Sequence, residues 1–541
     1  MCSQVLPPRH DKARCFAIIA LGLAPFAFGF LALALGQDAN WDLRNYHWYN
    51  AYAFLAGRYD ADFLPSQIPS FYNPILDIPF YLLATHVSSK TAGFILGSVQ
   101  GVNFILLFMI AYVSLILKNK LYQTWICLAL ACLGMLGGGG VALIGTTFGD
   151  NITSLGILLT TLFVILSRQN EQENSWKRLS LEAFLYGVIP GLMMGLKLPN
   201  VVFCVGLCFA YLGGSEGWLK KIRLSFMFGL GVLLGLTLAF GHWALYLESH
   251  FGSPLFPYFN DYFKSPMLGL TNMRDTKFLP HGLKEVLTFP FLFANNPFRV
   301  GEIPWRDWRI PLLYLLLPLS LLIHFKFHRQ DQETLINKEA SRYLLWMGVL
   351  SYATWLMMFA IYRYAIPLEM LAPLLIVCAL GLWPLSNSKR LLCVAFLFGI
   401  IIVTIVPGNW TRRISWTDHF VETGIPPLGD TSNLIVLMAG IEPYSHLIPQ
   451  FPAAISFVRI ESNFTSPDQE NGINRLLRER LSSHKGRFMM MIPAWNKEEA
   501  HRAMAYFKLD FDAGPCQMVQ DKLYDKDDIE LCPVHRLNMR P

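Results

Sequence analysis

The sequence predicts an all-α polytopic membrane bundle of about eleven transmembrane helices, followed by a small α/β domain at the C-terminal end. Three observations lead to this fold class. Apolar residues make up 53% of the 541 positions and charged residues only 15%, well below the roughly one quarter that is typical of soluble domains. Long uncharged runs recur as far as residue 406. Beyond that point the chain becomes charged and rich in turn-forming residues.

Seven uncharged runs are each close to or above the ~20 residues that a helix needs to cross ~30 Å of hydrocarbon. They cover residues 16–36, 91–117, 121–149, 151–167, 224–247, 343–361 and 391–406. Four shorter or lightly interrupted runs, at 179–196, 198–215, 310–323 and 366–383, bring the total to about eleven. We expect the first run to be retained as a span, because it is too long for a secretory signal and no Ala-x-Ala site follows it.

Lysine and arginine fall in alternate loops, as expected of loops retained in the cytoplasm. With the N-terminus inside, the basic loops at 9–14, 118–120, 168–178, 220–223, 326–342 and 389–390 all lie on the cytoplasmic side. The opening loop after residue 37, the segment 248–309 and everything after residue 406 then lie on the outer face. The net charge of +6 reflects this loop bias and indicates no nucleic-acid partner.

The predicted domain boundary divides a transmembrane domain, residues 1–407, from an outer α/β domain, residues 408–541. In the latter, "NLIVLMAG" and "RFMMMIPA" are short enough to be strands, whereas "INRLLRERLSSHKG" and "NKEEAHRAMAYFKL" are typical of helices. Cys516 and Cys532 are the two cysteines of this domain. An oxidising outer compartment allows a disulfide between them, worth ~3 kcal/mol in the chain-entropy model. No CxxC or His/Cys cluster indicates a metal site.

The stretch "NWDLRNYHWYNAYAFLAGRYD", residues 40–60, follows the first span. Asp42, Tyr46, Tyr49, Asn50 and Ala53 recur at helical spacing, which predicts a helix on the outer membrane surface with these residues on one face, ending near Gly57. An interfacial aromatic belt accounts equally well for the aromatic residues, especially Trp48 and Tyr52. It does not account for Asp42, because a carboxylate at the membrane boundary is costly unless it faces water or a partner.

Five stretches place polar groups at predicted outer ends of spans. They are Asp42-Leu43-Arg44-Asn45-Tyr46, "YNPILDIPFYLLATH" at 72–86, "GTTFGDNITSLGILL" with Asp150, "GLMMGLKLPN" with Lys197, and "IYRYAIPLE" with Arg363. In this order they resemble the motifs of the GT-C superfamily of membrane glycosyltransferases, which includes protein O-mannosyltransferases and lipid A aminoarabinose transferases. Residues 72–86 resemble the second of two surface helices in the first outer loop of that fold, and they are too short to span a bilayer. The resemblance covers about residues 10–410. Leu43 replaces the frequent Glu of an Asp-Glu pair, and the C-terminal domain matches no subfamily.

The resemblance implies an enzyme that moves a sugar from a polyprenyl-phosphate carrier to an acceptor hydroxyl with inversion at the anomeric carbon. Asp42 would remove the proton of the acceptor, with Asp38, one helical turn earlier, as the alternative base. Arg363 and Lys197 would stabilise the departing lipid phosphate. Lys197 also fits simple snorkelling of a long side chain to the interface.

Five further residues are candidates for substrate binding. Asp150 could contact the sugar, orient the base or bind a divalent ion, but it also suits a helix cap. Tyr46 and His47 neighbour Asp42, and a lone histidine is more often structural. Tyr258 and Arg274 lie in the long outer segment 248–309, which is of a length typical of lids and binding surfaces. Any cofactor is unknown.

We expect the protein in a bacterial inner membrane with its C-terminal domain in the periplasm, an endoplasmic-reticulum membrane being the alternative. The expected partners are membrane lipid, a polyprenyl-phosphate-linked sugar donor and a glycan, lipid or protein acceptor. Two other functions stay open: a transporter or flippase of lipid or sugar, and a non-catalytic subunit of an envelope glycan assembly complex. A transporter usually has related halves with broken helices, and no such halves are apparent in the sequence.

Overall fold

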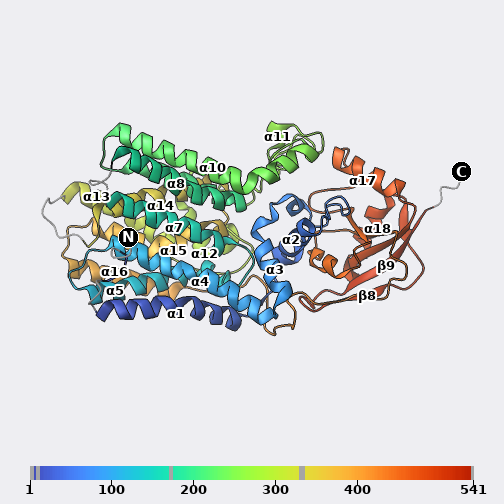
Figure 1. Cartoon of the computed structure of the whole chain (residues 1–541), viewed down its shortest axis with the longest axis horizontal. Helices are drawn as coiled ribbons and strands as arrows, with labels where there is room; N and C mark the ends of the chain where they lie inside the picture. The colour runs from blue at the N-terminus through green and yellow to red at the C-terminus, as the bar shows by residue number, and fades with distance from the viewer. Residues whose placement is uncertain (1–4, 8–11, 170–174, 328–334, 538–541) are drawn as a thin grey trace.

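The computed structural model describes residues 5–7, 12–169, 175–327 and 335–537. Figure 1 shows a bundle of long helices, a domain built on a β-sheet beyond one end of it, and the short helices α2 and α3 between the two parts. The sequence therefore predicts the two main parts of the architecture.

Each of the eleven predicted runs contains a helix, although in the run 121–149 the long helix ends at Met135. Eight of the helices in the described residues are long and apolar enough to cross a membrane; of the other three, α5 and α9 are shorter and α14 carries more polar residues. The eleven helices are α1 (Lys12–Leu35), α4 (Ser89–Ser114), α5 (Lys120–Met135), α7 (Asp150–Gln169), α8 (Trp176–Leu196), α9 (Val201–Ala210), α10 (Trp218–Phe251), α13 (Arg309–Phe327), α14 (Lys338–Met358), α15 (Ile366–Gly381) and α16 (Asn387–Thr404).

Local sequence explains where several of these helices begin. The side chains of Ser88, Asn119, Ser175 and Asn337 each accept a hydrogen bond from the backbone N–H three residues on, at the start of α4, α5, α8 and α14. Such a cap satisfies one of the amides that a helix start leaves unpaired. Helices α8 and α10 pack closely because glycines face each other; a Cβ on Gly187 would lie 2.1 Å from the carbonyl oxygen of Phe228.

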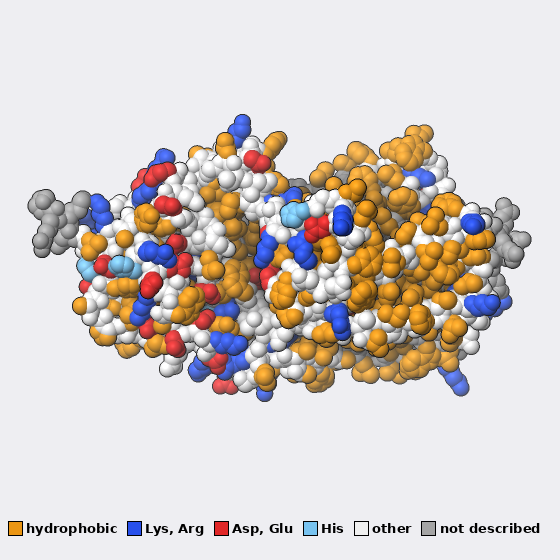
Figure 2. All heavy atoms as spheres, turned by 180° about the vertical axis from the view of Figure 1, so that it is seen from behind, with side chains coloured by type: hydrophobic (Ala, Val, Ile, Leu, Met, Phe, Trp, Pro, Cys, Tyr) orange, Lys and Arg blue, Asp and Glu red, His pale blue; other side chains and the backbone are white. Residues whose placement is uncertain are grey.

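The predicted cytoplasmic loops meet at the end of the bundle that is remote from the sheet domain. Arg168, at the end of α7, pairs with Glu216 at 2.5 Å and with Glu339 at 3.4 Å, and the N–H of Ile116 donates to Leu335. Parts of these loops lie outside the described residues. Apolar side chains cover the surface of the bundle, whereas charged side chains gather over the sheet domain and at the junction (Figure 2). This division supports a multi-pass membrane protein.

The C-terminal domain contains a seven-stranded mixed sheet with the order β3-β8-β9-β6-β4-β5, in which β7 also pairs with β9. Strands β5, β4 and β6 run parallel. The strands are β3 (Thr423–Gly424), β4 (Leu434–Met438), β5 (Ser456–Arg459), β6 (Arg487–Pro493), β7 (Leu509–Phe511), β8 (Gln517–Asp521) and β9 (Ile529–Arg536). The two predicted strands are β4 and β6, and the two predicted helices are α17 (Gly472–Ser483) and α18 (Lys497–Ala505). A disulfide joins Cys516 to Cys532, as the sequence predicts.

The two faces of β4 pack against different parts of the protein. Ile435 and Leu437 join a core with residues of α17 and α18, whereas Val436 and Met438 join a core that includes Tyr49 of α2 (Trp48–Leu55). This alternation follows from the two-residue period of a strand. The sheet domain is therefore packed onto the segment that follows the first span.

The segment 40–60 differs from the expected regular surface helix. It begins with a π-helical turn, η1 (Leu43–His47), continues as α2 and ends before Gly57, which has a φ of +62°. Because a π-turn takes up about one more residue than an α-turn, the residues after it rotate to a new face. The predicted single face is thus wrong: Tyr46 donates to Asp42, whereas Tyr49 and Ala53 pack against the sheet domain.

Three aromatic residues of this segment, Tyr46, Trp48 and Tyr49, are buried inside the protein, whereas Trp41 and Phe54 are exposed and Tyr52 is half-buried. Trp48 is 3% exposed and packs between Tyr81 of α3 (Ile78–His86) and Phe420. The belt interpretation of Trp48 is therefore wrong, because neighbouring protein covers its ring. Helix α3 has nine residues, too few to span a bilayer, as predicted for this stretch.

Candidate functional site

Asp42 and Arg363 form an ion pair at the end of the bundle that faces the sheet domain. Oδ2 of Asp42 lies 3.0 Å from Nη1 of Arg363, and the two side chains are 16% and 15% exposed. Tyr46 donates its hydroxyl to the same carboxylate oxygen at 3.2 Å. The other oxygen, Oδ1, accepts no hydrogen bond from any residue in the described part of the chain, which leaves it available to a substrate.

The chain leaving the first span fixes the position of Asp42. Asn40 accepts a hydrogen bond from the N–H of Leu43 at 2.8 Å, as a helix cap does. One carboxylate oxygen of Asp38 accepts a hydrogen bond from the side-chain amide of Asn40 at 2.6 Å. The other accepts from the backbone N–H and the hydroxyl of Thr147, at 2.8 and 2.9 Å. Asp38 also lies in β1 (Gln37–Asp38), which pairs with β2 (Arg412–Arg413) after the last span. Asp38 is fully buried with both oxygens engaged, so the geometry favours Asp42 over Asp38 as the base.

The turn before α15 presents Arg363. It is a 3-10 turn, η8 (Tyr362–Ala365), and Pro367 stands in the first turn of the helix that follows, where its missing N–H costs nothing. Trp355 donates to the carbonyl of Ile361 at 2.7 Å. The guanidinium lies 4.2 Å from the centre of the Phe148 ring and 4.8 Å from that of Trp410. These two rings hold it flat against the bundle.

Lys197 and Asp150 form a second ion pair beside the first. Nζ of Lys197 lies 2.7 Å from Oδ1 of Asp150 and also donates to the carbonyl of Phe148 at 2.7 Å. Lys197 ends α8, and Asp150 begins α7 directly after Gly149, which has a φ of +80°. A Cβ on Gly149 would lie 2.7 Å from Leu76. Glycine therefore lets the start of α7 approach the segment that carries Asp77.

A histidine-aspartate pair borders the same region. Nδ1 of His47 lies 2.7 Å from Oδ1 of Asp77, and the side chains are 6% and 10% exposed. We call Asp42, His47, Asp77, Asp150, Lys197 and Arg363 the charged cluster. Tyr258, from the long outer segment, reaches it indirectly: its hydroxyl lies 2.7 Å from that of Tyr72, and the Tyr72 ring packs edge-on against Tyr46.

The surroundings in the cluster shift the pKa values of Asp42 and Asp77 in opposite directions. Burial raises the pKa of Asp42, but Arg363, His47 and Lys197 outweigh burial, and the net effect is a pKa below its ordinary value. For Asp77 burial prevails over His47 and Lys197 and is reinforced by Asp42, so that pKa is raised. Asp42 therefore stays ionised at neutral pH.

Several buried polar atoms of the cluster lack a hydrogen-bond partner among the described residues. They are Nε2 of His47, Oδ2 of Asp150 and Nε of Arg363. Buried polar groups are almost always paired, so each exception requires an explanation. Three lie in this one cluster, so each needs a polar partner that the described residues do not supply.

The structure brings most of the predicted site residues together. Asp42, Tyr46, His47, Asp150, Lys197 and Arg363 lie in or against the cluster, and Tyr258 reaches it through Tyr72. Arg274 does not join it: no contact within the described residues connects its side chain to the cluster. Sequence reasoning missed Asp77, Tyr72, Phe148 and Trp410. The sequence could have indicated Asp77 as a candidate site residue, because it is the acid at the start of the second predicted surface helix.

One group in the described ranges has the spacing of a metal site, namely Cys516, Glu530 and Cys532. Its two sulfurs are bonded to each other, so they offer no thiolate ligand.

The sequence matches no protein-family model, no curated protein and no solved structure. Function is therefore inferred from the chemistry of the charged cluster and from the motifs along the chain.

Proposed function

We propose that the protein is a glycosyltransferase that moves a sugar from a polyprenyl-phosphate carrier to an acceptor hydroxyl at the outer face of a membrane. The observation that carries the proposal is the Asp42–Arg363 pair, 3.0 Å apart, with unpaired polar atoms around it. Such a pair offers a base for the acceptor and a cation for the carrier phosphate side by side. The motif resemblance to the GT-C superfamily supports the same assignment.

The acceptor is activated by Asp42. Its free oxygen, Oδ1, takes the proton of the acceptor hydroxyl as the oxygen attacks the anomeric carbon. The bond from that carbon to the phosphate oxygen breaks, and its electron pair leaves with the lipid phosphate. Attack opposite the leaving group inverts the anomeric centre, so the reaction needs no covalent intermediate. The lowered pKa of Asp42 keeps the carboxylate ionised before each turnover.

Arg363 and Lys197 receive the departing phosphate. Negative charge grows on the leaving oxygen as the bond breaks, so fixed cations stabilise the transition state more than the ground state. Arg363 uses one guanidinium nitrogen for Asp42 and has an unpaired Nε, which leaves donors for a phosphate oxygen. Lys197 adds a second positive charge next to it. No step in this scheme requires a metal ion.

The position of the cluster supports a lipid-linked carrier and a site at the outer face of the membrane. The cluster lies at the end of the bundle opposite the basic loops. With those loops in the cytoplasm, this end would face the periplasm of a bacterial inner membrane. A carrier with a long prenyl chain can keep that chain in the bilayer while its phosphate reaches this end. The acceptor would enter from the side of the sheet domain.

The proposal is tested by transfer assays with the purified full chain in proteoliposomes. A panel of polyprenyl-phosphate monosaccharides with radiolabelled sugars is supplied with envelope glycan, lipid and peptide acceptors. We expect transfer of at least one sugar, and a loss of 10²- to 10⁴-fold in Asp42→Asn without loss of folding. Asp261→Asn, a change at an exposed position, is the matched control. Carrier movement across the bilayer that survives Asp42→Asn would indicate a flippase, and carrier binding without turnover would indicate an accessory subunit.

A further inference from the structure

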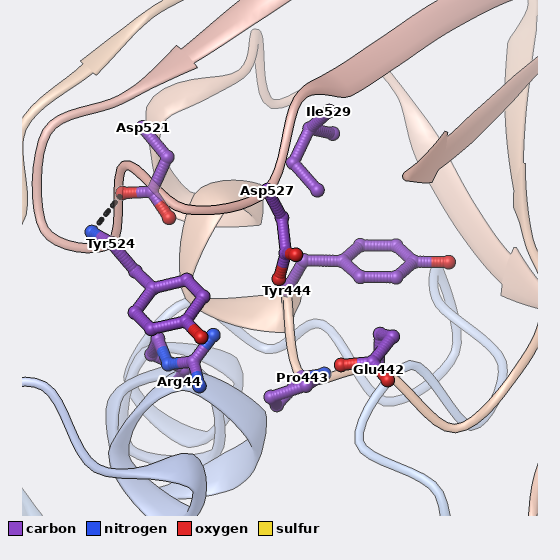
Figure 3. Close-up of a pocket in the computed structure, with 8 residues that line it drawn as sticks. All are labelled: Arg44, Glu442, Pro443, Tyr444, Asp521, Tyr524, Asp527 and Ile529. Atoms are coloured by element: carbon purple, nitrogen blue, oxygen red, sulfur yellow. Dashed lines mark hydrogen bonds between the residues drawn. The ribbon is translucent and has the colours of Figure 1, made fainter. Parts of the chain in front are cut away.

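The C-terminal domain contacts the helical turn that carries Asp42. Arg44 lies two residues after Asp42, about half a turn away, and its guanidinium stacks 3.6 Å from the centre of the Tyr524 ring. Figure 3 shows Arg44 opposite residues of the C-terminal domain at a small pocket lined by Glu442, Pro443, Tyr444, Asp521, Tyr524, Asp527 and Ile529. The pocket encloses about 10 Å³, room for about one water molecule. The junction is therefore a packed contact and has no space for a substrate.

The π-turn at this junction displaces one backbone carbonyl from its usual partner. In an α-helix the N–H of Trp48 would donate to the carbonyl four residues earlier, that of Arg44. Here it donates to Leu43 instead. The carbonyl oxygen of Arg44 is met from outside the helix by Nδ1 of His446, 3.1 Å away. A side chain of the C-terminal domain thus supplies the hydrogen bond that the helix register gives up.

His446 is itself held by Asp521 at the end of β8. Nε2 of His446 lies 2.8 Å from Oδ2 of Asp521, and the two side chains are 1% and 4% exposed. A backbone carbonyl can only accept a hydrogen bond, so Nδ1 donates to Arg44, and Nε2 faces the Asp521 carboxylate. Burial raises the pKa of Asp521, but His446 and the N–H groups of Leu523 and Tyr524 outweigh burial and lower it overall. Asp521 thus remains ionised opposite the ring.

We infer that His446 is a positioning residue for Asp42: its Nδ1–H, oriented by Asp521, holds the π-turn that aims the Asp42 carboxylate at Arg363. The C-terminal domain is then a structural part of the site, whichever acceptor it meets. The effect on sugar transfer depends on the proposed function, whereas the effect on the helical turn does not.

Other contacts hold the domain in place without His446. Gln67 donates to Asn45 at 3.3 Å and to the carbonyl of Ile441 at 2.9 Å, and Ser445 donates to the carbonyl of Pro65 at 2.5 Å. Variants at position 446 therefore change at most two hydrogen bonds within a larger junction.

Two substitutions at His446 separate its two bonds. His446→Asn keeps an N–H at the place of Nδ1 and can still meet the Arg44 carbonyl. His446→Gln keeps a donor near the place of Nε2 and can meet Asp521 but not Arg44. Hydrogen-deuterium exchange of the full chain in lipid nanodiscs reports the amides of residues 43–52 without any substrate. His501→Gln, an exposed histidine of the same domain with a 58% exposed side chain, is the matched control.

We expect exchange in residues 43–52 to rise about tenfold or more in His446→Gln and to stay within about threefold of wild type in His446→Asn and His501→Gln. A folded Asn variant beside a Gln variant that does not fold would also support the inference. Equal exchange in the Gln and Asn variants, or loss of folding in both, would overturn it. A protein that never transfers sugar but shows the expected exchange would refute the proposed function alone.

Discussion

Asp42 and Arg363 lie 3.0 Å apart although 321 positions separate them in the sequence. One stands just beyond the first span and the other at the turn before α15. Removing charged groups from water is costly, so a pair at 15–16% exposure needs further polar contacts or a functional reason. The charged cluster supplies two further pairs, Lys197–Asp150 and His47–Asp77, and buried polar atoms without a partner among the described residues.

The first prediction concerns pH. Because the pKa of Asp42 lies below its ordinary 3.8, the stability of the ion pair is present above about pH 4 and is lost as the pH falls through the lower folded value. Protonation of Asp42 should therefore not slow transfer between pH 7 and pH 5. In Arg363→Gln the effect of burial on the pKa of Asp42 prevails. The fall of kcat/KM toward acid pH, the acid limb of the profile, should therefore move to higher pH. The check is kcat/KM against pH in proteoliposomes.

Asp77 is the control for that profile, because its pKa is raised. An acid limb that disappears in Asp77→Asn belongs to the His47–Asp77 pair. An acid limb above pH 5 that persists in Asp77→Asn would contradict the assignment of Asp42 as the base.

The second prediction concerns the shape of the cation. Arg363→Lys keeps the charge but loses the planar fork and the contact with the Phe148 and Trp410 rings. Loss of one charged hydrogen bond costs ~1.5–3 kcal/mol, which corresponds to a reduction of about 10- to 150-fold in transfer. Transfer and carrier binding are measured in parallel, with Arg306→Lys at an exposed site as control. Wild-type transfer by Arg363→Lys would show that charge alone suffices there.

The third prediction concerns the Lys197–Asp150 pair. Because both side chains are largely buried, at 15% and 6% exposure, removing one partner leaves an unpaired charge and should cost roughly 3–5 kcal/mol. Lys197→Met and Asp150→Leu should each lower the thermal midpoint, and the double variant should recover part of the loss. Thermal unfolding of all four proteins in detergent gives the cycle. Additive losses would mean that the two residues act independently.

The fourth prediction concerns the disulfide. A bond that closes the 16-residue separation between Cys516 and Cys532 should stabilise the C-terminal domain by ~3 kcal/mol. Reduction, or the double change to serine, should speed hydrogen exchange in β8 and β9 and leave the bundle unchanged. Alkylation in intact cells before and after reduction tests its formation in vivo, with Cys15, an exposed free thiol, as the internal reference. Labelling of Cys516 without reductant would contradict an oxidising compartment.

The eight helices that are long and apolar enough to cross a membrane could be predicted because each carries its own signal. A run of about twenty uncharged residues has few alternatives to a buried helix, and each of the eleven predicted runs contains a helix. The strands β4 and β6 were predictable for a similar reason, since short apolar runs between turns are typical of buried strands.

The pairing of charges could not be predicted in the same way. Lys197 forms an ion pair with Asp150, 47 positions away in the sequence. Neither sequence motif indicates that the other would be its partner. Trp410 lies against Arg363 because the chain returns, after α16, to the end of the bundle that faces the sheet domain, which depends on the whole fold.

The π-turn is a tertiary effect as well. Local spacing in residues 40–57 favours a regular helix, but the register change is accompanied by a hydrogen bond from His446, 402 positions from Arg44. The predicted face failed for this reason, while the prediction that Asp42 and Tyr46 are neighbours held, because their contact lies within the turn itself.

The most direct test is a cryo-electron microscopy structure of the full chain in lipid nanodiscs with undecaprenyl phosphate. We expect the phosphate within hydrogen-bond distance of the Arg363 guanidinium, beside Lys197, with the free oxygen of Asp42 facing the space where a sugar would be attached. A phosphate bound at the opposite end of the bundle, or one whose site excludes both Asp42 and Arg363, would contradict sugar transfer at this cluster.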